Sequence, residues 1–93
     1  MSEHRMEWAI LEAERELREA VERYGPFASG HEGLAVLWEE FEELKAEVWK
    51  SPKKRDYAAM HAEAVQVAAM SLRFIVDVTL PALEAQGRLG DPE

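Results

Sequence analysis

The most concentrated set of candidate functional side chains in this sequence is a run of glutamates between positions 39 and 47. At about 100° of rotation per residue of an α-helix, Glu40, Glu43 and Glu47 form a stripe along one edge of a helix, beside its apolar face. Carboxylates at this spacing repel one another by roughly a few tenths of a kcal/mol per pair. The run therefore predicts either a solvated acidic face or a site where a bound cation neutralises the charge.

Glu63 is the second chemical signal, because it stands in a largely apolar segment, positions 62–70, that contains no basic residue. A carboxylate in apolar surroundings is costly unless it has a partner. If the two helices that carry these glutamates pack antiparallel, Glu40, Glu43 and Glu63 converge into a cluster of oxygen ligands. Such a cluster suits Mg²⁺ or Mn²⁺, and the cation would bridge substrate phosphates.

A polar strip continues from Glu63 along the same side of its helix through Gln66, Arg73 and Asp77. Arg73 and Asp77 are four residues apart, which is the spacing of an ion pair along a helix. The rest of this helix, over positions 57–78, is apolar around nearly its whole circumference. A helix of this kind is typical of the centre of a bundle, where it packs on several sides.

Three long helices are predicted to position these residues. The first covers positions 6–24 and ends at Gly25-Pro26, a flexible residue followed by one that lacks a backbone donor. Its apolar residues recur at spacings of four and three, which predicts one buried stripe. This stripe comprises Met6, Ile10, Ala13, Leu17, Ala20, Val21 and Tyr24.

The second helix is predicted to begin near Gly30, because Ser29 and Glu32 have the spacing of a capping box. It runs to about position 49 or 50, and Ser51-Pro52 follows. Its predicted buried stripe consists of Leu34, Leu37, Phe41, Leu44 and Val48.

The third helix has two candidate starts, at Pro52 with Ser51 as its cap or at Tyr57 with Asp56 as its cap. Pro81 interrupts the pattern, so positions 79–86 are predicted to form either a kinked continuation or a short fourth helix that Thr79 could cap. Positions 87–93 are expected to be a loose tail. No period of two residues indicates a strand.

Composition limits the class of protein. Ninety-three residues make one small domain, with a core expected over about positions 5–86. A net charge of -8 argues against nucleic-acid binding, and we find no uninterrupted apolar run that would span a membrane. Cysteine is absent and the first six residues lack a secretory apolar stretch, which favours the cytoplasm.

The fold class predicted from these elements is all-α: an antiparallel bundle of three long helices plus a short C-terminal helix. Three such helices, one of them apolar on several sides, cannot hide their apolar surface within one small monomer. We therefore expect a homodimer or homotetramer that completes the bundle.

These motifs resemble those of the MazG-like all-α nucleoside triphosphate pyrophosphohydrolases, and in particular a small phage-associated branch. Family members carry Glu-x-x-Glu on one helix and Glu-x-x-Asp on the next. Here Glu40 to Glu43 is similar to the first motif, and Glu63 to Gln66 to the second, with Gln66 in place of the usual Asp. The resemblance covers about positions 31–78.

The resemblance implies that Glu40, Glu43 and Glu63 hold Mg²⁺, or Mn²⁺ in its place, and that the substrate is a nucleoside triphosphate. It is hydrolysed to the monophosphate and pyrophosphate. Gln66 would then either offer a neutral amide oxygen to the metal or a water, or leave the site to draw on Glu47 or Asp77.

Further roles follow for residues near the cluster. A glutamate that does not bind the metal, Glu39 or Glu47, is the candidate general base. The basic residues between the two acidic helices, together with Arg73, are candidates for phosphate contact, although solvated loops commonly carry such residues. These substrate candidates are Lys50, Lys53, Lys54 and Arg73.

The sequence thus predicts a Mg²⁺-dependent nucleoside triphosphate pyrophosphohydrolase that associates with itself. The alternative is a non-catalytic helical interaction module of the same fold. Gln66 favours that alternative, and Glu63 in its apolar surroundings favours the enzyme.

Overall fold

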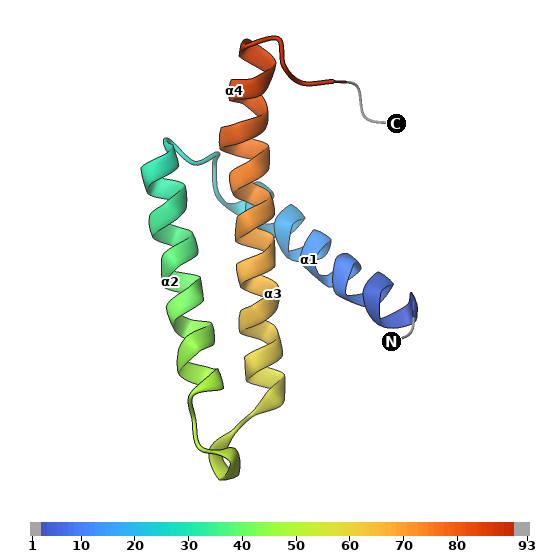
Figure 1. Cartoon of the computed structure of the whole chain (residues 1–93), viewed down its shortest axis with the longest axis vertical. Helices are drawn as coiled ribbons and strands as arrows, with labels where there is room; N and C mark the ends of the chain where they lie inside the picture. Colours follow the sequence, from blue (N-terminus) through green and yellow to red (C-terminus); the bar gives the residue numbers. More distant parts are fainter. Residues whose placement is uncertain (1–2, 91–93) are drawn as a thin grey trace.

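The computed structural model describes residues 3–90, and helices account for most of this part of the chain (Figure 1). No strand occurs within residues 3–90, so the predicted all-α class is confirmed. In chain order the elements are α1 (Glu3–Arg23), α2 (Gly30–Val48), a 3-10 turn (Pro52–Lys54), α3 (Tyr57–Phe74), a π-helical segment (Ile75–Thr79) and α4 (Leu80–Ala85).

Two of the long helices, α2 and α3, run side by side in opposite directions, joined by the 3-10 turn at one end (Figure 1). Helix α1 also packs against α3 but leaves it at a wide angle, so that the N-terminal half of α1 projects away from the other helices (Figure 1). Helix α3 is therefore the central element, as its apolar circumference predicts.

Local chemistry sets the starts of α2 and α3. The Ser29 hydroxyl accepts a hydrogen bond from the Glu32 amide at 3.1 Å, as the capping-box spacing predicts, and Glu32 accepts one from the Ala28 amide at 3.1 Å. Asp56 accepts hydrogen bonds from the amides of the second and third residues of α3, at 3.0 and 3.1 Å. Of the two candidate starts, the structure therefore uses Asp56-Tyr57, while Pro52 begins the short 3-10 turn.

Pro81 lies within a helix that continues without a break from α3 through the π-helical segment to α4. Pro81 has no amide hydrogen to donate, which would leave a gap in a regular ladder. Here the Leu80 amide donates to the Ile75 carbonyl five residues earlier, and the Thr79 hydroxyl donates to the same carbonyl at 3.3 Å. The wider turn accommodates the proline, so the first alternative, a continuation of the helix, is correct.

The protomer has a small core. It is built on four buried residues from α1, the α1–α2 loop and α3, with further apolar side chains from α2 and α3 packed around them. The radius of gyration is 15.4 Å, whereas a compact domain of this length is expected to have about 12 Å. The buried residues are Ala20, Phe27, Ala69 and Met70.

The predicted apolar stripe of α1 is only partly buried. Ala13 and Ala20 are buried, but Met6 and Ile10 are 54% and 64% exposed. The wide angle between α1 and α3 leaves the side chains of Met6 and Ile10 largely uncovered within residues 3–90.

Helix α2 buries only part of the predicted stripe: Leu37 and Leu44 are half-buried, as predicted, but the buried face is rotated away from the rest of the stripe. Leu34, Phe41 and Val48 of the predicted stripe are exposed. The buried and half-buried positions of α2 instead include two glutamates, and we call them the inner seam: Gly30, Gly33, Val36, Leu37, Glu40, Leu44, Lys45 and Glu47. The exposed apolar residues next to it form a second row, the outer stripe, made of Leu34, Trp38, Phe41 and Val48.

Gly33 explains how closely α2 approaches its neighbours, and it supplies a prediction. A Cβ atom at position 33 would lie 2.7 Å from the Phe74 ring and 3.0 Å from the Phe27 ring. Gly33→Ala is therefore expected to destabilise the protein by about 2 kcal/mol, measured by urea unfolding, because two rings must move. Gly25→Ala, where no atom lies within 4 Å of the added carbon, is the matched control. A Gly33 variant as stable as wild type would contradict this packing.

The continuous helix Tyr57–Ala85 is long and apolar enough to cross a membrane, by length and composition alone. Core helices of soluble proteins meet the same criterion. Two charged residues of this helix, Arg73 and Asp77, bond to the α1–α2 loop of the same protomer. These bonds are consistent with a core helix.

Candidate functional site

Three carboxylates meet in the seam between α2 and α3. Glu40 and Glu43 project from α2 and Glu63 from α3, and one oxygen of each lies within 4.8 Å of the others. These are the three residues that the sequence expected to converge. Glu40 and Glu63 are half-buried and Glu43 is exposed, so one side of the cluster is open.

One oxygen of this cluster is buried without a partner. The Oε2 atom of Glu63 is inaccessible to solvent and accepts no hydrogen bond. A buried carboxylate oxygen in this state is costly, and either a proton or a cation would relieve the cost.

The electrostatics of the cluster favour uptake of positive charge. Burial, followed by the negative charges of Glu43 and Glu63, raises the pKa of Glu40 from 4.5 to about 7. Burial and the neighbouring Glu43 and Glu47 likewise raise the pKa of Glu63 above its ordinary value. The cluster therefore holds protons that isolated glutamates would release.

A pH dependence of stability follows from the raised pKa of Glu40. Between pH 4.5 and about 7 the folded protein holds a proton on Glu40 that the unfolded chain has released, so stability falls as the pH rises through this window. We expect a loss of about 2 kcal/mol in urea unfolding with a chelator present, a figure reduced for partial solvent exposure. Mg²⁺ should reduce the loss, and Glu40→Gln should flatten this part of the profile. A flat wild-type profile in chelator would contradict the expectation.

The two candidate general bases lie in different places. Glu47 belongs to the inner seam, is close enough to raise the pKa of Glu63, and accepts hydrogen bonds from the Lys50 ammonium at 2.9 and 3.1 Å. Glu39 is exposed and borders a shallow hollow formed with Trp38 and Leu34 of the outer stripe, although its negative charge also raises the pKa of Glu40. Of the two, only Glu47 adjoins the cluster from the buried face of α2.

Asp77 and Arg73 hold the α1–α2 loop against α3. Asp77 accepts a hydrogen bond from the Phe27 amide at 3.0 Å, and Arg73 donates to the Gly25 carbonyl at 2.7 Å. The two side chains also form the ion pair that their spacing predicts, at 3.6 Å. The Arg73 guanidinium lies 3.9 Å from the centre of the Phe27 ring. Both charged groups are thus occupied in fastening the loop.

Asp77→Asn is expected to destabilise the protein by about 1–3 kcal/mol, because the buried Arg73 loses its counter-charge. Metal affinity should stay within about twofold of wild type, since Asp77 is engaged by the loop rather than grouped with the carboxylate cluster. Thermal unfolding and Mn²⁺ titration measure the two effects separately. A large loss of Mn²⁺ affinity with no loss of stability would return Asp77 to the metal site.

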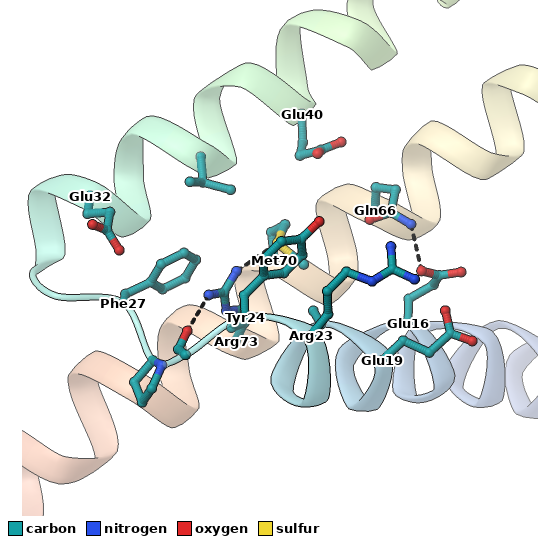
Figure 2. A pocket seen from close by; sticks show the side chains of 14 residues that line it. Glu16, Glu19, Arg23, Tyr24, Phe27, Glu32, Glu40, Gln66, Met70 and Arg73 are labelled. Atoms are coloured by element: carbon teal, nitrogen blue, oxygen red, sulfur yellow. Dashed lines mark hydrogen bonds between the residues drawn. The ribbon is translucent and has the colours of Figure 1, made fainter.

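Gln66 lies one turn of α3 beyond Glu63 and bonds to the first helix. Its side-chain nitrogen donates to Glu16 of α1 at 2.8 Å (Figure 2). His61, on the exposed side of α3, makes a second contact to α1 through Glu12 at 3.0 Å. These two polar contacts bring α1 to the edge of the carboxylate cluster.

A cavity of about 730 Å³ opens beside the cluster, between the end of α1, the α1–α2 loop, α2 and α3 (Figure 2). Its volume is within the range of small-molecule sites. Glu40 reaches it from α2, Gln66 and Arg73 from α3, and Arg23 and Tyr24 from the end of α1. Carboxylate, cationic and aromatic side chains thus share one hollow.

The predicted phosphate-binding lysines do not line this cavity. Lys53 and Lys54 are exposed in the 3-10 turn, at the opposite end of α2 from the cavity (Figure 1). Lys50 pairs with Glu47. Arg73 does line the cavity, although its guanidinium is buried against the loop.

Glu16, Arg23 and Tyr24 are the cavity residues that sequence reasoning missed. Glu16 is one of many glutamates on α1, and nothing in its spacing distinguishes it from the rest. Arg23 and Tyr24 precede the Gly25-Pro26 turn, and only the path of the loop brings them to α2 and α3.

The donor set fits Mg²⁺ or Mn²⁺. Carboxylate oxygens are hard ligands, and Mg²⁺ keeps several waters, so three carboxylates with one open side suit it better than a closed protein cage. The buried, unpartnered Glu63 oxygen favours a bound positive charge, either a proton or a cation, over a solvated acidic surface. Comparisons with protein-family models, curated proteins and solved structures found no match.

Proposed function

We propose that this protein is a metal-dependent hydrolase whose site is the cluster Glu40, Glu43 and Glu63. More specifically, we propose a MazG-like nucleoside triphosphate pyrophosphohydrolase, which releases pyrophosphate and a nucleoside monophosphate. The observation that carries the proposal is the meeting of three carboxylates around a buried oxygen that has no partner.

The residues divide the work as follows. Glu40, Glu43 and Glu63 would hold Mg²⁺, or Mn²⁺ in its place, and the ion would supply charge neutralisation and polarise a phosphoryl oxygen when bound. Glu47, which lies near Glu63 and is bonded to Lys50, would accept a proton from the attacking water. Arg23 is the cation placed to contact the substrate, and Tyr24 offers an aromatic surface in the same cavity.

Self-association is part of this proposal. The outer stripe of α2 has the four and three spacing of a helix–helix seam, yet Trp38 is 61% exposed and Phe41 is 53% exposed. Apolar rows of this kind in a small domain are covered by another chain. A second copy that lays the same stripe against this one would complete an antiparallel bundle and leave the cavity open. A cytoplasmic location is consistent with the absence of cysteine from this chain.

The test is pyrophosphate release from a panel of canonical and modified nucleoside triphosphates, with Mg²⁺, with Mn²⁺ and with chelator. Wild type is compared with Glu40→Gln and with Glu42→Gln as the matched control. Glu42 belongs to the same acidic run but bonds to Trp38 and Lys45 on the exposed side of α2.

Metal-dependent release that is lost in Glu40→Gln and kept in Glu42→Gln is the expected result. No release from any triphosphate, by folded and self-associated protein, would overturn the proposal. The non-catalytic interaction module would then be the better description of this chain.

A further inference from the structure

The hydrogen bond between Gln66 and Glu16 fixes which end of the Gln66 amide is turned toward α1. The Gln66 nitrogen donates to a Glu16 oxygen at 2.8 Å, in a partly buried contact between residues fifty positions apart. A carboxylate accepts hydrogen bonds and an amide oxygen cannot donate, so the amide cannot turn over without losing this bond.

The oxygen of Gln66 is consequently left on the side away from Glu16. Gln66 lines the large cavity together with Glu40, and a smaller cavity of about 210 Å³ together with Glu63. Figure 2 shows the bond to Glu16 with Glu40 reaching into the same cavity from α2. A neutral amide oxygen is an acceptable ligand for a hard cation.

Other residues that could supply a fourth ligand are engaged elsewhere. Asp77 accepts from the Phe27 amide, and Glu47 is bonded to Lys50. Glu16 also lines both cavities, so a fourth negative charge stands beside the cluster although position 66 is neutral.

We propose that Glu16 is a positioning residue for the cation site: it orients Gln66 so that the amide oxygen completes the donor set of Glu40, Glu43 and Glu63. This inference rests on the proposed function, because it assumes that the cluster binds a cation. It assigns to α1 a part in the site that the two motif helices alone would not predict.

The experiment is titration with Mn²⁺ alone, followed by electron paramagnetic resonance of the free ion, without substrate. We expect Glu16→Ala to weaken Mn²⁺ binding about tenfold, because the freed amide can present its nitrogen to the cation. Glu16→Gln keeps an oxygen that accepts from Gln66, and its affinity should remain within about threefold of wild type. Glu12→Ala is the matched control, since it removes a separate polar contact between α1 and α3 and should leave the affinity unchanged.

The double variant Glu16→Ala/Gln66→Ala separates positioning from a direct effect of charge. If Glu16 acts through Gln66, the double variant binds Mn²⁺ no more weakly than Gln66→Ala alone. Additive losses would overturn the positioning role, and so would wild-type affinity in a Glu16→Ala protein whose circular dichroism and thermal unfolding show it to be folded.

If the proposed function is wrong, the Mn²⁺ titration gives a different result. In that case wild type either binds no Mn²⁺ or binds it equally well after Glu63→Gln. If binding depends on Glu63 but not on Glu16, the cation site stands and only the positioning role is wrong.

Discussion

Glu63→Gln is expected to make the protein more stable without metal and to abolish its turnover. The substitution removes a charge that is buried beside Glu43 and Glu47, and it replaces an orphaned carboxylate oxygen with an uncharged amide. At pH 8 with a chelator present, the free energy of unfolding should rise by about 1 kcal/mol. Metal-dependent pyrophosphate release should fall by about 100-fold or more, because a ligand of the cation is lost.

The effects on stability and on turnover have opposite signs, and this difference distinguishes a metal ligand from a residue that only supports the fold. A residue that only supports the fold would lower stability and activity together. Glu42→Gln, on the exposed side of α2, should change neither quantity. If Glu63→Gln leaves stability, Mn²⁺ affinity and turnover as they are in wild type, the carboxylate cluster is not a cation site.

The second large expected effect is a change of oligomeric state when the outer stripe is altered. Trp38→Glu/Phe41→Glu is expected to convert a homo-oligomer into a monomer, because it places two charges in an apolar row that a second copy would cover. Central aromatic residues of interfaces contribute roughly 2–4 kcal/mol each. Sedimentation equilibrium measures the mass, and urea unfolding at two protein concentrations measures the linked loss of stability.

Leu89→Glu is the control for this variant, since Leu89 is an exposed apolar residue of the C-terminal segment, outside the helices. It should leave the mass unchanged. A wild-type protein that sediments as a monomer at all concentrations would contradict self-association, and the outer stripe would then need a different partner. Loss of the oligomer with Mn²⁺ affinity retained would place the whole cation site within one protomer.

The helix ends and the candidate ligands could be read from sequence because their causes are local. Ser29 and Asp56 bond to amides within three residues of themselves, so spacing alone placed the start of α2 and limited the start of α3 to two candidates. The convergence of Glu40, Glu43 and Glu63 needed only one further assumption, that two adjacent helices pack antiparallel.

The rotation of α2 could not be read in the same way. Two rows of this helix, the inner seam and the outer stripe, are neighbours on its surface, and the outer stripe is the more apolar of the two. Apolar periodicity predicts which stripe of a helix is buried. It does not say whether the surface that covers this stripe belongs to the same chain or to another one. The contact of Gly33 with the Phe27 and Phe74 rings determines the rotation of α2, because the absence of a side chain at Gly33 allows the close approach at this face.

The sequence by itself determined that this protein is helical, where α2 begins, and which carboxylates lie at helical spacing, since each of these depends on contacts within a few residues. Tertiary structure alone decided that Asp77 and Arg73 fasten a loop and that Glu16 meets Gln66. These contacts join residues about fifty positions apart, and the path of the α1–α2 loop and the angle of α1 bring them together. No local pattern encodes that geometry, because it results from the packing of Phe27, Ala69 and Met70 in a core shared by three helices.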